Sequence, residues 1–251
     1  MIETILITGA GKRIGRAMAL GLAKAGHKIV VHYHRSAADA DHLVKEIIAD
    51  GGTAHAIGAD LYDETALDRL IDDAAVQAGP ISCLINNAST FLNDDLLSAN
   101  RESWDQHMQV NLRAPFVLTQ KFAAQLPPAM AGSVLNVIDH RVWKLNPLFS
   151  TYTLSKAALW TFTQTAAQAL APRIRVNAVG PGPVLPSTHQ SAEDFAKEAA
   201  SVPLGHGPSL DEFVKAVQFL LDASSITGQM IALDGGQHLA WRTADVDASK
   251  G

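Results

Sequence analysis

Cysteine is nearly absent from this chain of 251 residues, which has a single one at position 83. A lone cysteine cannot close a disulfide within the chain, so the fold must be held by its apolar core. Cys83 lies in the apolar run Ile81–Ile85, which is typical of a buried strand. We therefore expect Cys83 to be a small apolar core residue.

Long apolar runs and an excess of positive charge are also missing. No apolar stretch approaches the ~18 residues of a membrane span, and the N-terminus enters an apolar segment without a basic leader. A net charge of -5 and a pI near 6.0 give no general attraction to nucleic acid or to anionic membranes. These absences predict a cytoplasmic protein that binds neither a membrane nor nucleic acid.

Metal-ligand patterns and internal repeats are lacking as well. His32, His55 and His107 stand at no spacing with cysteines or carboxylates that is typical of a metal site, so no metal is expected. With 47% hydrophobic and 18% charged residues, the chain can bury the core of one α/β domain. We expect that domain over residues 1–240, followed by a C-terminal tail over 241–251.

Short runs rich in isoleucine and valine alternate with segments of helical periodicity. Near-continuous apolar strands separated by helices predict a parallel sheet covered on both faces, which is a Rossmann-like, doubly wound α/β fold. One long helical segment begins near Asn100 and contains Pro115, which we expect to kink or divide it. The proline-rich residues from about 183 to 209 are the least regular part and are expected to form a substrate loop. Seven strands fit the pattern: Ile5–Ile7, Lys28–His32, Ala54–Ile57, Ile81–Ile85, Val134–Ile138, Ile174–Ala178 and Met230–Leu233.

A glycine-rich turn, Thr8-Gly9-Ala10-Gly11-Lys12-Arg13-Ile14-Gly15, follows the first predicted strand and precedes an amphipathic helical pattern. Glycines let the backbone bend tightly and approach a ligand, and the free N–H groups of the helix attract a pyrophosphate. The turn alone could be an ordinary connection. Its place between a first strand and a helix predicts a dinucleotide site that includes Gly9, Lys12, Arg13, Ile14 and Gly15.

The end of the second predicted strand distinguishes between the two nicotinamide dinucleotides. A chain that binds NAD usually has an acid here for the ribose 2′-hydroxyl, yet no acid occurs before Asp39. His34, Arg35 and Ser36, with the basic residues of the glycine-rich turn, offer donors and positive charge for a 2′-phosphate. The alternative is a solvated charged surface, but the position of the cluster favours NADP(H), the NADPH/NADP pair, as the cofactor.

A tyrosine and a lysine four residues apart suggest proton transfer. Tyr152 and Lys156 would share one face of a helix, and Asp139 follows the apolar run Val134–Ile138 upstream of them. A cation beside a phenol favours its ionised form, which lowers the cost of passing a proton near neutral pH. The same spacing occurs on solvated helix faces, so the motif gains its meaning from the rest of the chain.

Several motifs, taken in their order, resemble the short-chain dehydrogenase/reductase family. The resemblance covers nearly the whole chain, to Leu233-Asp234-Gly235-Gly236, and implies a single Rossmann-like domain, hydride transfer from a nicotinamide and, commonly, a homotetramer. The motifs are Thr8-Gly9-x-x-x-Arg13-x-Gly15, Asp60-Leu61, Asn86-Asn87-Ala88-Ser89, Asn111, Tyr152-x-x-x-Lys156 and Pro181-Gly182.

The resemblance also implies a role for each matching residue. Asn111 would support a proton-relay water, and Lys156 would hold the nicotinamide ribose. The remaining cofactor contacts would be Asp60 and Leu61 at the adenine, Asn87, Ala88 and Ser89 along the cofactor, and Pro181 and Gly182.

Two departures from the usual pattern resemble the pteridine reductases and the related dihydrofolate/dihydromonapterin reductases of this family. Arg13 replaces the middle glycine of the turn, and Asp139 replaces the serine that helps the tyrosine polarise a carbonyl. The strings His32–Ala38 and Asn87–Phe91 agree with that subfamily. By this resemblance Phe91 would stack a pterin against the nicotinamide, and the residues hydrogen-bonding the pterin would be Arg13, Ser89, Asp139 and Tyr152.

The predicted function is NADPH-dependent reduction of a pterin or folate, in which Tyr152 and Asp139 deliver the proton. A flat heteroaromatic ring gains from an aromatic platform, and its C=N bond needs a proton on nitrogen when hydride reaches carbon. One alternative is a reductase of carbonyl substrates, including 3-oxoacyl chains. Another is a sensor that binds NADPH without turnover, although a sensor need not keep a proton relay. Phe91 could instead belong to the core, and His140–Trp143 could line the substrate pocket or pack a loop.

Overall fold

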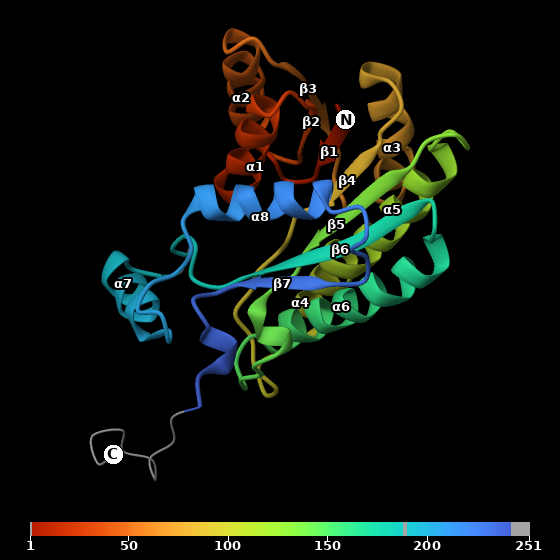
Figure 1. Ribbon diagram of the computed structural model, residues 1–251. Helices are drawn as coiled ribbons and strands as arrows, with labels where there is room; N and C mark the ends of the chain where they lie inside the picture. Colours follow the sequence, from red (N-terminus) through yellow and green to blue (C-terminus); the bar gives the residue numbers. More distant parts are fainter. Residues whose placement is uncertain (1, 188–189, 242–251) are drawn as a thin grey trace.

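The computed structural model describes residues 2–187 and 190–241 and contains one sheet of seven parallel strands. The strand order is β3-β2-β1-β4-β5-β6-β7 (Figure 1), and the predicted Rossmann-like α/β fold is confirmed. Most of the predicted C-terminal tail, residues 242–251, and two residues of the predicted substrate loop, 188–189, lie outside the described residues. The strands are β1 (Thr4–Ile7), β2 (Lys28–Tyr33), β3 (Thr53–Gly58), β4 (Cys83–Asn86), β5 (Gly132–Val137), β6 (Ile174–Pro181) and β7 (Met230–Leu233).

Helices cover both faces of the sheet (Figure 1). One face carries α1 (Arg13–Lys24), α2 (Ala37–Ala49) and α8 (Leu210–Asp222). The other carries α3 (Glu64–Ala78), α4 (Arg101–Met108), α5 (Ala114–Gln125) and α6 (Ser150–Leu170). The helix α7 (Ala192–Ser201) has no buried residue and stands apart from both layers (Figure 1). Two short 3₁₀ helices, η2 (His140–Val142) and η3 (Gln237–Leu239), follow β5 and β7.

Alternating side chains of the strands explain why both faces need a helical cover. In β1, Ile5 and Ile7 pack in one cluster with Phe213 of α8, whereas Leu6 packs in another with Phe122 of α5. All five side chains are essentially inaccessible to solvent. Burying apolar area on both faces gives the sheet its stability, at about 25 cal/mol per Å².

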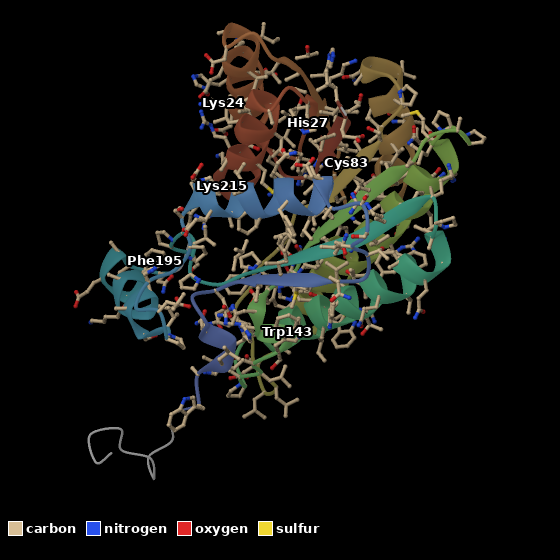
Figure 2. All side chains as sticks on the ribbon, viewed as in Figure 1. Lys24, His27, Cys83, Trp143, Phe195 and Lys215 are labelled. Carbon is tan, nitrogen blue, oxygen red and sulfur yellow. The ribbon has the colours of Figure 1, made fainter. Side chains whose placement is uncertain are left out.

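The long helix predicted from Asn100 is divided, as expected. Between α4 and α5 the chain forms a π-helix, η1 (Gln109–Arg113), and Pro115 stands in the first turn of α5, where its missing N–H is tolerated. The strand predicted over Ile81–Ile85 begins at Cys83, which is buried within the sheet as predicted (Figure 2).

The sheet order reverses between β1 and β4, because β2 and β3 extend to one side and β5 to β7 to the other. The loops that follow β1 and β4 therefore diverge and open a crevice at the carboxyl ends of the strands. Within the described residues, none of the helices has the length and apolar character of a membrane span.

Candidate active site

A cavity of about 1090 Å³ occupies this crevice at the carboxyl ends of the strands. Most of the residues predicted for the site line it, although Asn111, Asp60 and Leu61 do not. Phe195 of α7, labelled in Figure 2, contributes to the rim. The predicted residues in the lining are Gly9, Lys12, Arg13, Ile14, Gly15, His34, Arg35, Ser36, Asn87, Ala88, Ser89, Phe91, Asp139, Tyr152, Lys156, Pro181 and Gly182.

At two positions, Gly9 and Gly15, the glycine-rich turn requires glycine. Gly9 has a φ of 63°, and a Cβ at Gly15 would collide with the carbonyl oxygen of Gly9. Asn87 Nδ2 donates to the carbonyl oxygens of Thr8 (2.8 Å) and Gly9 (3.1 Å), which ties the turn to the end of β4. Helix α1 then begins without a side-chain cap and without an acid in its first turn. Its N–H groups and positive end therefore fit a pyrophosphate.

His32 supports this turn from inside the sheet. Its Nδ1 accepts a hydrogen bond from the Gly9 N–H (3.1 Å), and its Nε2 lies 3.0 Å from the carbonyl oxygen of Ala59. These partners require the proton to be on Nε2. Burial lowers the pKa of His32 to about 4, so the ring is neutral at physiological pH. In the described residues no cluster of histidine, cysteine and carboxylate side chains could hold a metal ion.

Four basic side chains and one hydroxyl group gather at the end of the cavity beside β2, which we call the phosphate end: Lys12, Arg13, His34, Arg35 and Ser36. Arg35 is exposed there, whereas Lys12 Nζ forms an ion pair with Asp39 Oδ2 at 3.0 Å. A planar, permanently charged guanidinium suits a phosphate dianion. These donors fit the 2′-phosphate that distinguishes NADP from NAD.

The predicted adenine contacts lie just outside the cavity lining. Asp60 Oδ2 is 3.4 Å from His34 Nε2, so Asp60 adjoins the phosphate end through that histidine. Leu61 is buried and packs in the core. Their roles at the adenine remain predictions.

Arg13 connects the glycine-rich turn with the predicted substrate loop. Its backbone has a φ of 54°, in the left-handed region where the family usually has glycine, and its Nη2 donates to the carbonyl oxygen of Pro186 at 2.8 Å. Arg13 therefore links the glycine-rich turn to the segment at Pro186 beside the cavity.

Tyr152 and Lys156 lie at the opposite end of the cavity, which we call the reaction end. Both project from α6 and both are buried. Tyr152 Oη donates to Asp139 Oδ2 (2.9 Å), and Lys156 Nζ donates to the carbonyl oxygen of Val137 (2.9 Å). The lysine Nζ is 5.7 Å from the centroid of the tyrosine ring.

The charge balance at the reaction end differs from the sequence-based expectation that Lys156 would favour ionisation of the phenol. Burial and the neighbouring Asp139 carboxylate raise the pKa of Tyr152 well above its usual value. Burial also lowers the pKa of Lys156 to about 8. Tyr152 is therefore a protonated phenol at neutral pH, because burial and the adjacent anion outweigh the opposing charge of Arg141.

Asp139 immediately follows β5 and is surrounded by donors. Arg141 donates to it from its backbone N–H (2.8 Å) and from Nη1 (3.1 Å), and His140 Nδ1 lies 3.1 Å from Oδ1. Burial raises the pKa of the carboxyl group, but the hydrogen bond from His140 and the charge of Arg141 outweigh burial and hold the pKa below its usual value. Asp139 is thus a carboxylate, and the proton of the Asp139–Tyr152 pair is on the tyrosine.

An aromatic wall faces this pair. Phe91 stacks on Phe149 with ring centroids 4.4 Å apart and an interplanar angle of 15°, and it meets Tyr152 edge-on at 4.7 Å. Phe91 is half-buried, lines the cavity and joins no core cluster, which answers the alternative that it belongs to the core. Arg141 and Phe149 also line the cavity. The sequence left open whether His140–Trp143 lines the substrate pocket or packs a loop, and the structure shows that Arg141 lines the cavity.

The π-helix η1 turns Asn111 into the interior. Asn111 is fully buried; its Oδ1 accepts from the Thr90 N–H (2.9 Å), and its Nδ2 donates to Ser155 Oγ (3.1 Å) and to the Thr90 carbonyl oxygen (3.0 Å). Ser89 Oγ donates to the same Oδ1 at 3.1 Å. Asn111 therefore joins the loop after β4 to α6, and its predicted support of a proton-relay water remains a prediction.

A buried polar network behind the aromatic wall was not anticipated from the sequence. His107 Nε2 accepts from the Leu92 N–H (3.0 Å), and His107 Nδ1 lies 2.6 Å from Thr151 Oγ1. Thr151 in turn donates to Asp94 through its backbone N–H (3.1 Å) and its hydroxyl group. No local spacing reveals this network, because its members come from a loop and two helices far apart in the chain.

Comparisons with known proteins place this site among nicotinamide enzymes. The family model described as short chain dehydrogenase matches residues 3–198. A 3-oxoacyl-[acyl-carrier-protein] reductase of Staphylococcus aureus is 32% identical over 244 residues, which cover 95% of this chain and 99% of the relative.

Two solved structures carry the comparison further. The FolM alternative dihydrofolate reductase 1 of Brucella suis, in complex with NADP, is 46% identical with a TM-score of 0.95, covering 97% of this chain and 98% of that one. A blue fluorescent protein from a metagenomic library, in complex with NADPH, is 31% identical with a TM-score of 0.87, covering 94% and 97%.

Proposed function

This chain belongs to the short-chain dehydrogenase family, and from that membership we propose that it is an NADP-dependent reductase that transfers hydride to a pterin or folate. The predicted resemblance to the dihydrofolate reductases of this family is confirmed by the Brucella structures. Both of those structures, and the metagenomic protein, bind NADP or NADPH. The basic phosphate end of the cavity supports the same cofactor for this chain.

One observation carries the substrate assignment. A carboxylate, Asp139, accepts the hydrogen bond of Tyr152, and an aromatic ring, Phe91, lies 4.7 Å from that tyrosine. A flat heteroaromatic substrate can stack on Phe91, and its ring N–H groups can donate to a carboxylate, whereas a simple carbonyl needs neither feature. The pair therefore favours a pterin or folate over a ketone.

The residues present divide the reaction between them. When bound, the nicotinamide supplies the hydride, and the chain must supply the proton. Tyr152 Oη is the protonated group of the site, and it gives its proton to the substrate nitrogen as hydride reaches the adjacent carbon of the C=N bond. Lys156, with its pKa of about 8, is largely an ammonium at neutral pH and stabilises the phenolate that remains.

Asp139 then helps to restore the phenol. As the carboxylate bonded to Tyr152 Oη, it can receive a proton from solvent and pass it to the tyrosine. Asp139 thereby acts as a relay in the proposed cycle, which retains the predicted joint role of Tyr152 and Asp139 while putting the first proton on the tyrosine.

A substrate panel tests the proposal. Purified protein should oxidise NADPH with 7,8-dihydrobiopterin or 7,8-dihydrofolate far faster than with an acetoacetyl thioester or a small diketone. Fluorescence titration with NADPH serves as the control, because it reports cofactor binding without turnover. Tight NADPH binding with no oxidation on any pterin or folate would contradict the proposal and support a sensor.

The second candidate is a reductase of 3-oxoacyl substrates. The supporting observation is the 32% identity to the 3-oxoacyl-[acyl-carrier-protein] reductase, which spans nearly all of both chains. Asp139 argues against a 3-oxoacyl reductase, because a carboxylate beside Tyr152 repels the oxyanion that forms when a carbonyl is reduced. A higher rate on the acetoacetyl thioester than on both dihydropteridines would favour this candidate.

We also propose a cytoplasmic homotetramer. Exposed apolar side chains on three neighbouring helices support self-association: Trp104 of α4, Phe116 of α5 and Leu154 of α6. Light scattering on the purified protein tests the assembly, and fractionation of cells tests the compartment.

A further inference from the structure

Arg141 contacts both Asp139 and the aromatic wall at the reaction end. Its Nη1 lies 3.1 Å from Asp139 Oδ2, and its backbone N–H donates to Asp139 Oδ1 at 2.8 Å. Its guanidinium carbon is 5.6 Å from the ring centroid of Phe91 and 5.4 Å from that of Phe149. The side chain is only 18% exposed, so a single arginine packs against the acid and the aromatic wall together.

We infer that Arg141 is a positioning residue that keeps Asp139 ionised and clamped beside Tyr152. Its relevance to turnover rests on the proposed function. The salt bridge with Asp139 and the cation–π contacts with two rings hold the guanidinium in place, whereas a solvated surface arginine has neither. Its Nε is buried and has no hydrogen-bond partner, a cost that the contacts of the other guanidinium atoms must offset.

The groups that face Asp139 show why the arginine matters. His140 Nδ1 lies 3.1 Å from Asp139 and equally close to the carbonyl oxygen of Pro181, so its N–H is shared. Tyr152 donates a hydrogen bond from a neutral phenol, and Lys156 Nζ donates its hydrogen bond to the carbonyl oxygen of Val137. Among the residues that the structure describes, Arg141 is the only permanently charged group within ion-pair distance of Asp139.

Loss of this charge has a definite consequence. Burial pushes a carboxyl group toward its protonated form, and an adjacent guanidinium opposes burial by about 1–3 pKa units. A protonated Asp139 no longer accepts as an anion from Tyr152, and it presents an O–H group to the substrate. The protonation of Asp139, and with it the pH range of turnover, should therefore depend on Arg141.

The test compares Arg141→Met, which keeps much of the apolar stem, with Arg141→Lys, which keeps the charge. The pH profile of kcat/KM is measured with 7,8-dihydrobiopterin and NADPH, and the limb that Asp139→Asn abolishes is assigned to Asp139. Arg141→Met should move that limb upward by about one pH unit or more, and Arg141→Lys by less. Arg101→Met is the matched control, because Arg101 forms an exposed ion pair with Asp105 on α4 and should leave the limb in place.

A second readout does not need turnover. Infrared titration of the protein with bound NADP, as a difference from Asp139→Asn, follows the C=O stretch of the protonated carboxyl group directly. Arg141→Gln provides another uncharged variant if Arg141→Met does not fold. An Asp139 titration that stays in place in a folded, uncharged variant overturns the inference, whereas absence of pterin turnover by the unmodified protein would refute the proposed function and leave this readout decisive.

Discussion

The phosphate end and the reaction end of the cavity hold charge in opposite ways. At the phosphate end, the side chains of Lys12 and Asp39 are 61% and 45% exposed while they form their ion pair. At the reaction end, the side chains of Arg141 and Asp139 are 18% and 12% exposed and share further partners. Both ends carry an acid and a base, but only at the reaction end are both side chains of the pair largely buried.

This difference determines what each end can do. Exposed charges are screened by water and salt, so they contribute modestly to stability and serve mainly to select a charged ligand. Buried charges interact strongly and shift the pKa of their neighbours. Removal of one partner leaves the other charge buried and unpaired, which destabilises the protein. Substitutions at the reaction end should therefore alter chemistry, and those at the phosphate end should alter cofactor affinity.

Asp139→Ser should have the largest effect. It should cut kcat/KM for a dihydropterin by about 10²-fold or more, the usual scale of a lost proton-transfer group, and leave NADPH affinity nearly unchanged. Steady-state kinetics on 7,8-dihydrobiopterin and on a small diketone make the comparison, with retained or increased diketone activity expected. Asp139→Asn keeps the shape and should be impaired too, while undiminished dihydropterin turnover would favour the carbonyl reductase.

Arg35→Ala should have the next largest effect, and only on one cofactor. Loss of a charge-assisted contact to the 2′-phosphate should weaken NADPH binding by roughly tenfold to a hundredfold and hardly affect NADH. Fluorescence titration with both cofactors measures this difference. Lys45→Ala, which removes an equal charge from the exposed side of α2, is the control, and equal losses for NADPH and NADH would show that Arg35 does not read the phosphate.

Phe91→Ala should change substrate binding more than cofactor binding. An aromatic pair contributes about 0.5–1.5 kcal/mol beyond its buried area, so the KM for a dihydropterin should rise by about twofold to tenfold. The KM for NADPH should change less. Phe219→Ala removes an exposed ring of α8 outside the cavity and should leave both constants unchanged. An unaltered pterin KM in a folded Phe91 variant would limit Phe91 to supporting Phe149.

Lys12→Ala should have the smallest effect of the four. Its charge is exposed and partly neutralised by Asp39, so the Kd for NADPH should rise by about threefold or less, with an unchanged melting temperature. Titration at low and high salt measures the residual contribution. A loss larger than that of Arg35→Ala would show that this exposed ion pair contributes more to cofactor affinity than screening by water and salt allows.

Much of the fold is predictable because central strands such as β1 are apolar on both faces. In β1, Ile5 and Leu6 enter clusters on opposite faces of the sheet, so an uninterrupted apolar run already implies two layers of helices. The division of the helix near Pro115 follows from proline chemistry, but the π-helix beside it does not. Its position depends on tertiary contacts of Asn111 that no local pattern contains.

The site is predictable where its residues are local in sequence and much less so elsewhere. Tyr152 and Lys156 share a helix face by spacing alone, whereas the contact of Tyr152 with Asp139 needs the packing of α6 beside β5. The pKa of Tyr152 shows the limit most clearly: the nearby cation is evident in the sequence, but burial and the anion that reverse its effect are tertiary. The place of Phe149 in the site could not be predicted either, because its stacking on Phe91 joins segments that are distant in the sequence.

The π-helix at Gln109–Arg113 makes the active site separable from the fold. A π turn holds one residue more than the α turn it replaces, so α4 and α5 are out of phase by one residue, and Asn111 stands in the surplus turn. Deleting one residue from this turn would remove the surplus residue and turn the Asn111 amide away from Thr90 and Ser155, while Pro115 would still mark the start of α5. A single codon deletion or insertion in this turn would therefore remove or restore the contacts of Asn111 without any substitution among the residues that line the cavity.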